Sequence, residues 1–96
     1  MDPEFEWDAG KAERNVRKHG IAFEEALTVF ADPLARIFDD PDHSSEEERE
    51  LIIGHSAKQR VVIVSFAEHG PRTRIISARK ATKRERQDYE ENTKED

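Results

Sequence analysis

The stretch RVVIVSFAE, residues 60–68, constrains the fold most, because apolar side chains occupy nearly every position of its centre, VVIVSFA. Successive side chains of a strand point to opposite faces of a sheet. Apolar residues in both registers therefore indicate a central strand that other elements cover on each side. The stretch is far too short to cross a membrane as a helix.

Further strand-like segments flank this central strand in the sequence. ERELIIGHS predicts a strand that ends at Gly54, HGP predicts a turn, and RTRIISA predicts the following strand. LARIF alternates in polarity and precedes the polar connection DDPDHSSEEE, and FEW, near the N-terminus, is a candidate edge strand. Consecutive strands with short connections most simply form an antiparallel meander.

Two helices are predicted before the meander. Asp8 is a favourable N-cap for a helix over AGKAERNVRKHG, and Gly20 suits the left-handed position that ends it. FEEALTVFAD predicts a second helix from about Phe23, which Pro33 stops. Ala22, at the N-cap position of this second helix, cannot accept a hydrogen bond from the free amides.

A third helix is predicted over TKRERQDYEEN. Thr82 and Glu85 match a capping box, which fixes the point where the last strand gives way to the helix. The order of elements predicts an α+β fold, in which two N-terminal helices pack on a twisted antiparallel sheet and a C-terminal helix follows.

The length of 96 residues fits a single domain over 1–96. Within it, residues 1–4 are typical of a cloning remnant, and we expect residues 93–96 to fray. The absence of cysteine excludes disulfides and cysteine-based zinc sites and suits a reducing compartment. The N-terminus has neither the basic start nor the apolar segment of a signal peptide. We therefore expect a cytoplasmic protein with no membrane partner.

Positive charge is concentrated in one segment of an acidic chain. The formal net charge is −6, yet RTRIISARKATKRER, residues 72–86, holds seven basic side chains against the single acid Glu85. Such a face can attract a nucleic acid, because salt screens charges that lie more than roughly 8–10 Å away. The alternative is a solvated edge whose helix charges pair with nearby acids. Composition alone leaves the two interpretations even.

Arg74 and Arg79 lie on the same predicted strand but differ in parity. On a regular strand their side chains leave from opposite faces of the sheet. They can approach one phosphate only if the strand twists or bulges between them, near Ser77. Lys80 and Lys83 follow at the junction with the last helix.

The histidines lie at none of the spacings typical of a metal site, so we predict no metal and no cofactor. His19 is placed to cap a helix C-terminus. Glu68 and His69, at a strand end near the basic strand, are candidates for acid–base work. Spacing alone favours a plain turn at this position.

Two motifs of the chain resemble a known family. The opening WD..K...N..KHG..FEEA and the closing RIISARKAT..E...Y resemble, in this order and separation, the BrnT toxins of type II toxin–antitoxin systems, and the resemblance extends from Phe5 to about Glu90. It implies a RelE-like fold and a ribonuclease that arrests translation. It also implies a BrnA-type antitoxin that neutralises the toxin and, together with it, represses the shared promoter, so that operator DNA is contacted through the antitoxin.

The resemblance carries over to matching positions near both ends of the chain. Two positions depart from the family pattern: Ala22 stands where members often have serine, and His69 stands where many have arginine, which weakens one phosphate-binding charge near neutral pH. The matching positions are Trp7, Asp8, Lys11, Asn15, Lys18, His19, Gly20, Glu24, Glu25, Glu68, Arg74, Ser77, Arg79, Lys80, Ala81, Glu85 and Tyr89.

These positions predict a metal-independent endoribonuclease, in which a ribose 2′-hydroxyl attacks the adjacent phosphorus. Two alternatives stay open: a non-catalytic module whose basic face binds an acidic partner or DNA, and a degenerate toxin that retains only antitoxin binding. The predicted catalytic residues are Arg79 and Arg74 for the phosphate, Glu68 as base, and His19 or His69 as acid. The predicted RNA-binding residues are Arg72, Lys80, Lys83, Lys18, Lys11 and Trp7.

Overall fold

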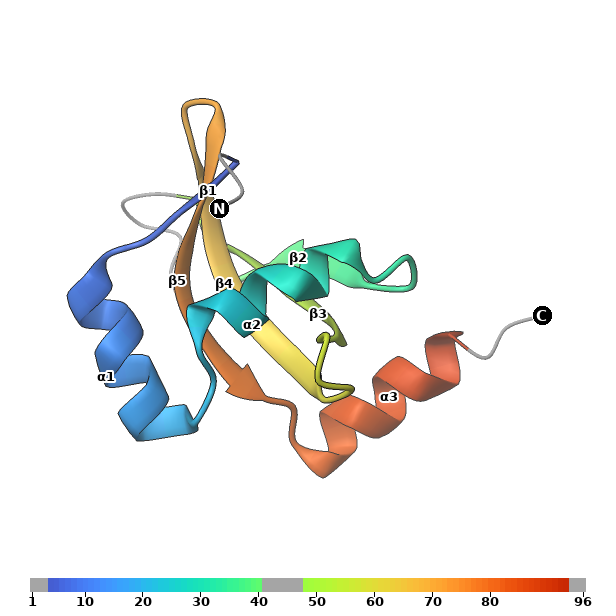
Figure 1. Ribbon diagram of the computed structural model, residues 1–96. Coiled ribbons are helices and arrows are strands. Elements are labelled where there is room, and N and C mark those ends of the chain that lie inside the picture. Colours follow the sequence, from blue (N-terminus) through green and yellow to red (C-terminus); the bar gives the residue numbers. More distant parts are fainter. Residues whose placement is uncertain (1–3, 41–47, 94–96) are drawn as a thin grey trace.

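The computed structural model describes residues 4–40 and 48–93. The α+β order predicted from the sequence is confirmed, and Figure 1 shows how the elements are arranged. The elements are β1 (Phe5–Glu6), α1 (Ala9–His19), α2 (Phe23–Ala26), the 3₁₀ segment η1 (Leu27–Ala31), β2 (Arg36–Asp39), β3 (Glu50–His55), β4 (Val61–His69), β5 (Arg72–Lys80) and α3 (Lys83–Thr93).

Three sequence predictions fall largely outside the described residues. Of the predicted remnant 1–4 only Glu4 is described, and of the predicted frayed tail 93–96 only Thr93, which ends α3. Residues 41–47 of the polar connection between β2 and β3 also lie outside them.

The five strands form one sheet in the order β1-β5-β4-β3-β2, with β4 at its centre. The predicted antiparallel meander is confirmed for β2 to β5. The prediction of a wholly antiparallel sheet is wrong, because β1 pairs with β5 in parallel. Only two residues separate β1 from α1, which packs along β5, and this short connection is compatible with the parallel direction of β1.

A β-bulge in β5 changes which of its side chains share a face. Ser65 of β4 pairs with Ser77, but Phe66 pairs with Ile75, so Ile76 is an extra residue in the ladder. An extra residue shifts the alternation of side chains by one position beyond the bulge. As a result Ile75 and Ala78, three positions apart, are buried in the same core.

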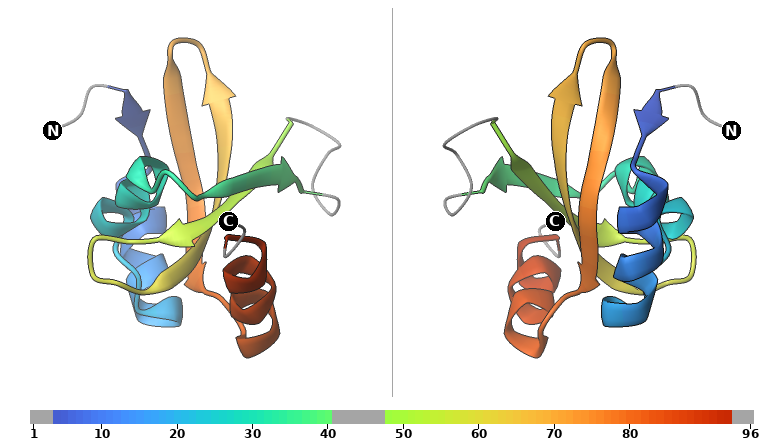
Figure 2. Two further views of the ribbon diagram at one scale, coloured as in Figure 1. Left: turned by 90° about the vertical axis from the view of Figure 1, so that its right-hand side faces the viewer. Right: turned by 90° about the vertical axis from the view of Figure 1, so that its left-hand side faces the viewer.

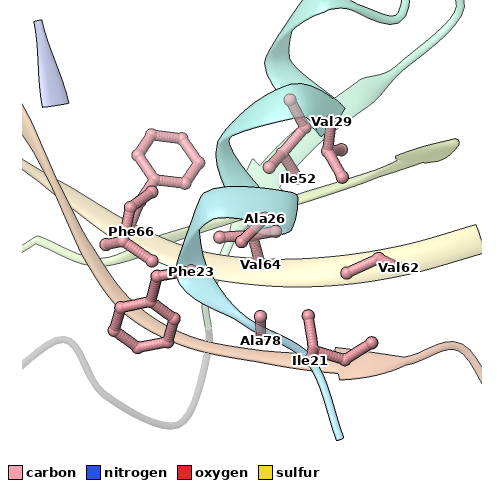
Figure 3. Close-up of a cluster of buried hydrophobic side chains, with 10 residues drawn as sticks. Ile21, Phe23, Ala26, Val29, Ile52, Val62, Val64, Phe66 and Ala78 are labelled. Atoms are coloured by element: carbon pink, nitrogen blue, oxygen red, sulfur yellow. The ribbon is translucent and has the colours of Figure 1, made fainter. Parts of the chain in front are cut away.

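Apolar clusters cover both faces of the sheet around β4, as the sequence predicted. Residues 61–67 of β4 are all buried. One cluster lies under α2 and η1, and Figure 3 shows its centre around Phe23, Val64 and Phe66. The other joins Tyr89 of α3 to Ile53, Val61 and Ile63 on the opposite face. Figure 2 shows the resulting layers, with α1 and α2 on one side of the sheet and α3 on the other.

The second helix is shorter than the sequence predicted. It is α-helical only over Phe23–Ala26 and continues as the 3₁₀ segment η1. Ala22 provides no side-chain cap for its amides, as expected. The Thr28 hydroxyl donates a hydrogen bond of 2.6 Å to the Glu25 carbonyl, a local bond that competes with continuation of the α-helix.

The predicted ends of the other two helices are confirmed. Asp8 caps α1 by accepting a 2.9 Å hydrogen bond from the Lys11 amide, and Gly20 ends it with a φ of 73°. Thr82 and Glu85 form the reciprocal capping box at the start of α3, with hydrogen bonds of 2.8 and 3.1 Å. Among the described residues, no helix has the length and apolar character needed to span a membrane.

Candidate functional site

The bulge in β5 places the arginines of this strand on one face of the sheet. Arg74 pairs with Ala67 and Arg79 with Ile63, two β4 residues of the same parity on the face that carries α3. Arg72, opposite His69, shares this face. Ala67 and Ile63 are four residues apart, which corresponds to about 13 Å along β4. The arginines therefore share a face, which is the condition for both to approach one RNA backbone. They occupy different points along that face.

At one end of this face Glu6, His69 and Arg74 form a group that we term the hairpin-end cluster. The parallel pairing of β1 with β5 brings Glu6 beside Arg74. The Oε2 atom of Glu6 lies 2.6 Å from His69 Nδ1 and 3.4 Å from Arg74 Nε. The His69 hydrogen bond, supported by Arg74, outweighs the opposing effect of burial and holds the pKa of the Glu6 carboxyl below its usual range.

A polar cavity of about 380 Å³ adjoins the hairpin-end cluster. Three residues that the sequence predicted for the site line it together: Trp7, Lys11 and Arg74. The Trp7 ring is fixed edge-on against Phe23, with ring centroids 5.9 Å apart. The cavity thus combines an aromatic wall with two cationic side chains, the groups that bind bases and phosphates of single-stranded RNA. Glu6, Asp8 and Ile75 complete its lining.

At the other end of the face Arg79 is fixed to the first turn of α3. Its Nη1 and Nη2 atoms donate to the two carboxylate oxygens of Glu85, at 2.8 and 3.0 Å. These hydrogen bonds, against a smaller effect of burial, lower the pKa of Glu85 to about 2. Because Glu85 also caps α3, the pair joins β5 to the helix.

A second contact holds α3 at this end and joins Tyr89, one of the family-matching positions, to Asp32, which the sequence did not single out. The Tyr89 hydroxyl donates a 2.6 Å hydrogen bond to Asp32 Oδ2, and the His55 amide donates to the same oxygen at 2.7 Å. Burial pushes the pKa of Asp32 up, but these hydrogen bonds and that from Leu34 hold it below its usual range. Burial and the Asp32 carboxylate together raise the pKa of Tyr89.

The structure does not bring the predicted base and acid together. His19 adjoins Gly20, whose carbonyl accepts a 3.4 Å hydrogen bond from Arg60 at the start of β4. Glu68 lies near the other end of that strand, roughly 25 Å away by strand rise. Its pairing with Thr73 also places it on the face opposite the arginines.

The remaining predicted RNA-binding lysines are spread over the surface. Lys18, Lys80 and Lys83 are exposed. Lys80 pairs with Val62 of β4, which places it on the opposite face from its neighbour Arg79. As exposed cations, these lysines can contact the phosphates of a polyanion.

Two of the positions that match the family motifs hold the fold together. Asn15 is buried in α1 and donates hydrogen bonds of 2.8 Å to the carbonyls of Ile21 and Ala78, which ties α1 to β5. The buried Glu25 accepts a 2.6 Å hydrogen bond from Ser56 and pairs with Arg60. Glu6, in contrast, escaped the sequence motifs, because only the parallel pairing of β1 brings it to the site.

Across the described residues, 4–40 and 48–93, His, Asp and Glu side chains form no group of three or more that could hold a metal ion. The polar groups at the hairpin end of the arginine face include arginines, a carboxylate and the imidazole of His69. They can bind a phosphate and transfer protons.

Comparisons with known proteins agree on one family. The family model described as "Ribonuclease toxin, BrnT, of type II toxin-antitoxin system" matches residues 7–85. The crystal structure of the Brucella abortus ribonuclease toxin BrnT is similar, with a TM-score of 0.62 and 25% sequence identity, over 80% of this chain and 94% of that chain. No curated protein matches significantly. The family match runs from the end of β1 to the first turn of α3, so Glu6 and Tyr89 lie just outside it.

Proposed function

Because the chain belongs to the family of BrnT ribonuclease toxins of type II toxin–antitoxin systems, we propose that it is a metal-independent endoribonuclease whose cleavage of RNA arrests translation. A ribose 2′-hydroxyl attacks the adjacent phosphorus, and the bond to the 5′-oxygen of the next nucleotide breaks. This reaction needs positive charge around the phosphorane and a proton for the leaving oxygen.

The observation that supports this proposal is the bulge in β5. It brings two arginines of opposite parity onto one face, at points about 13 Å apart along β4, so that Arg74 and Arg79 can both face an RNA backbone. Guanidinium groups bind phosphate oxygens through paired hydrogen bonds. Arg72, on the same face, and Lys11, in the adjoining cavity, extend the positive surface along the strand.

Arg74 and Arg79 are proposed to stabilise the phosphate, Trp7 to stack on a base, and Lys18, Lys80 and Lys83 to contact flanking phosphates. The proposed base and acid, Glu68 and His19, lie too far apart to act on one phosphate in this conformation. His69, the alternative acid, lies on the arginine face.

The direct test is incubation of the purified protein with naked RNA in EDTA. We expect fragments that end in a 2′,3′-cyclic phosphate and a 5′-hydroxyl, the products of 2′-hydroxyl attack. A parallel reaction in a translation extract detects cleavage that requires the ribosome. Fragments with 5′-phosphate ends, or cleavage that EDTA abolishes, would contradict the mechanism. Intact RNA in both reactions would favour a toxin that retains only antitoxin binding.

As the toxin of a type II system, the protein has a protein antitoxin as its partner, and we propose that this antitoxin is of the BrnA type. The antitoxin would neutralise the toxin by covering the arginine face, and the pair would contact operator DNA through the antitoxin. Induced expression of the toxin is expected to stop growth, and co-expression of a BrnA-type neighbour to restore it. Normal growth under strong induction would instead favour a non-catalytic binding module.

A further inference from the structure

We propose that His69 is the general acid of the cleavage reaction and that Glu6 is the positioning residue that holds it beside Arg74. This inference rests on the proposed ribonuclease function and deepens it. Neither the motifs nor the family match includes Glu6, and His69 stands where many members of the family have arginine. The proposed pair of His69 and Glu6 is therefore a feature of this chain and not of the family motifs.

The geometry of the hairpin-end cluster supports the proposal. One carboxylate oxygen of Glu6 contacts both His69 Nδ1, at 2.6 Å, and Arg74 Nε, at 3.4 Å. The side chain of His69 is 60% exposed, whereas that of Glu6 is 26% exposed. The carboxylate is thus partly covered behind an imidazole that solvent and substrate can reach.

The chemistry depends on which ring nitrogen of His69 contacts Glu6. An ionised carboxylate only accepts hydrogen bonds, so the short contact assigns a proton to Nδ1 of His69 and leaves Nε2 for the substrate. Donation of a proton from Nε2 therefore starts from a ring that carries a proton on each nitrogen. Arg74, held by the same oxygen, places a guanidinium next to that ring. A phosphate on Arg74 would lie within reach of the Nε2 proton.

The cleavage step conserves atoms and protons. The bond from the 2′-oxygen to phosphorus forms, the bond from phosphorus to the 5′-oxygen breaks, and the Nε2 proton of His69 passes to that leaving oxygen. The proton of the 2′-hydroxyl passes to water. The neutral imidazole then takes up a proton from water, which restores the starting state.

The other two histidines among the described residues are placed less favourably. His19 lies at the opposite end of β4 from the cluster. His55 belongs to the contact with α3, because its Nδ1 lies 3.4 Å from the Tyr89 hydroxyl and 3.6 Å from Asp32 Oδ2. The cavity of about 380 Å³ is lined in part by Glu6 and Arg74, the two residues that form the hairpin-end cluster with His69.

The charged groups beside His69 on the arginine face include Glu6 from β1, and Arg72 and Arg74 from β5. Of these, Glu6 is hydrogen-bonded to the imidazole. A change at Glu6 is therefore expected to act on the histidine directly.

The test uses two short oligonucleotides with one cleavable ribonucleotide linkage each. In one the leaving atom is oxygen, and in the other it is sulfur, which departs without a proton. We expect His69→Ala to slow cleavage of the oxygen substrate about 10²–10⁴-fold, as the loss of a general acid does. The sulfur substrate should be cleaved at close to the wild-type rate.

Glu6→Gln tests the positioning role, because glutamine can still accept the hydrogen bond but carries no charge. We expect a lower kcat on the oxygen substrate with little change in KM, and a pH–rate profile that differs from that of the wild type. The matched control is Glu13→Gln, which removes one negative charge from an exposed pair with Arg17 on α1. Its pH profile should coincide with that of the wild type. Circular dichroism verifies the fold of each variant.

Each possible outcome decides one of the two proposals. If His69→Ala slows both substrates equally, or neither, His69 is not the general acid, whereas the ribonuclease function stands. If Glu6→Gln leaves the pH profile unchanged, the positioning role of Glu6 is wrong. If the wild-type protein cleaves neither oligonucleotide nor RNA in a translation extract, the proposed function fails and this inference fails with it.

Discussion

The two ends of the arginine face hold the same residue type in different ways. At the hairpin end Arg74 contacts Glu6 through Nε at 3.4 Å, beside a polar cavity and an exposed imidazole. At the other end Arg79 makes two hydrogen bonds of 2.8 and 3.0 Å to Glu85, which also caps α3. One arginine borders open space, and the other is part of a joint between strand and helix.

This difference shows that the position of an arginine on a basic strand does not determine its role. The sequence motifs treat Arg74 and Arg79 alike. The carboxylate partner separates them: Glu6 comes from a two-residue strand and leaves the Arg74 side chain 37% exposed, whereas Glu85 belongs to the same joint that it stabilises. We therefore expect the hairpin end to serve mainly catalysis and the α3 end to stabilise the fold, with Arg79 contributing to both.

The largest effects are expected from Arg74→Ala and Arg79→Ala. Each should lower RNA cleavage about 10²–10³-fold, because each removes a charge that stabilises the phosphorane. Both proteins should stay folded by circular dichroism. Only Arg79→Ala should lower Tm, by about 4–8 °C, because it breaks the joint to α3 at a cost of about 1 kcal/mol for a partly exposed pair.

The control for both variants is Arg17→Ala, which removes an exposed arginine from α1. It should cleave RNA like the wild type. Undiminished cleavage by Arg79→Ala would remove this residue from the site and make the division between the two ends complete. Undiminished cleavage by Arg74→Ala would refute the assignment of chemistry to the hairpin end.

A smaller effect is expected from Tyr89→Phe, which tests the α3 end alone. The ring keeps its place against Ile53 and Ile63, but Asp32 loses its 2.6 Å hydrogen bond. The loss should cost about 1.5–3 kcal/mol, as hydrogen bonds to charged groups do. Urea unfolding should show a lower midpoint with an unchanged m value. A change in kcat of the folded variant, at equal substrate affinity, would show that α3 takes part in the chemistry.

Much of the fold follows from local patterns in the sequence. The doubly apolar β4, the capping box at Thr82 and the glycine that ends α1 are each set by residues within a few positions of one another. The parallel β1 escaped prediction, because two residues carry no signal for their direction or partner. The end of α2 escaped as well, because the Thr28 hydrogen bond competes with a periodic apolar pattern.

The candidate site was predictable in composition but not in geometry. The arginines and Trp7 stand out in the motifs. The sequence also raised the question whether Arg74 and Arg79, which differ in parity, can share a face of the sheet. The answer depends on Ile76, an ordinary strand residue that becomes the bulge because of how β4 and β5 align. Glu6 and Asp32 are hydrogen-bonded to His69 and Tyr89, which lie more than 50 positions away in the sequence. Such long-range pairs cannot be recognised from the spacing of residues.

The smallest effect is expected from Glu85→Gln, which removes the charge from the joint at the α3 end. The pKa of Glu85 is about 2 in the folded protein and 4.5 ordinarily, so its stabilising contribution is fully present above about pH 4.5 and is lost as the pH falls toward 2. At pH 7 the variant should be less stable by about 1 kcal/mol, since solvent screens this half-exposed pair.

The difference in Tm from the wild type should shrink below pH 4.5 and vanish near pH 2. The control is Glu91→Gln, on the exposed part of the same helix, which should show no such pH dependence. A difference in Tm that stays constant from pH 7 to pH 2 would mean that the Glu85 side chain holds α3 through the hydrogen bond it accepts from the Thr82 amide and not through its charge beside Arg79. The α3 end would then differ from the hairpin end in shape alone.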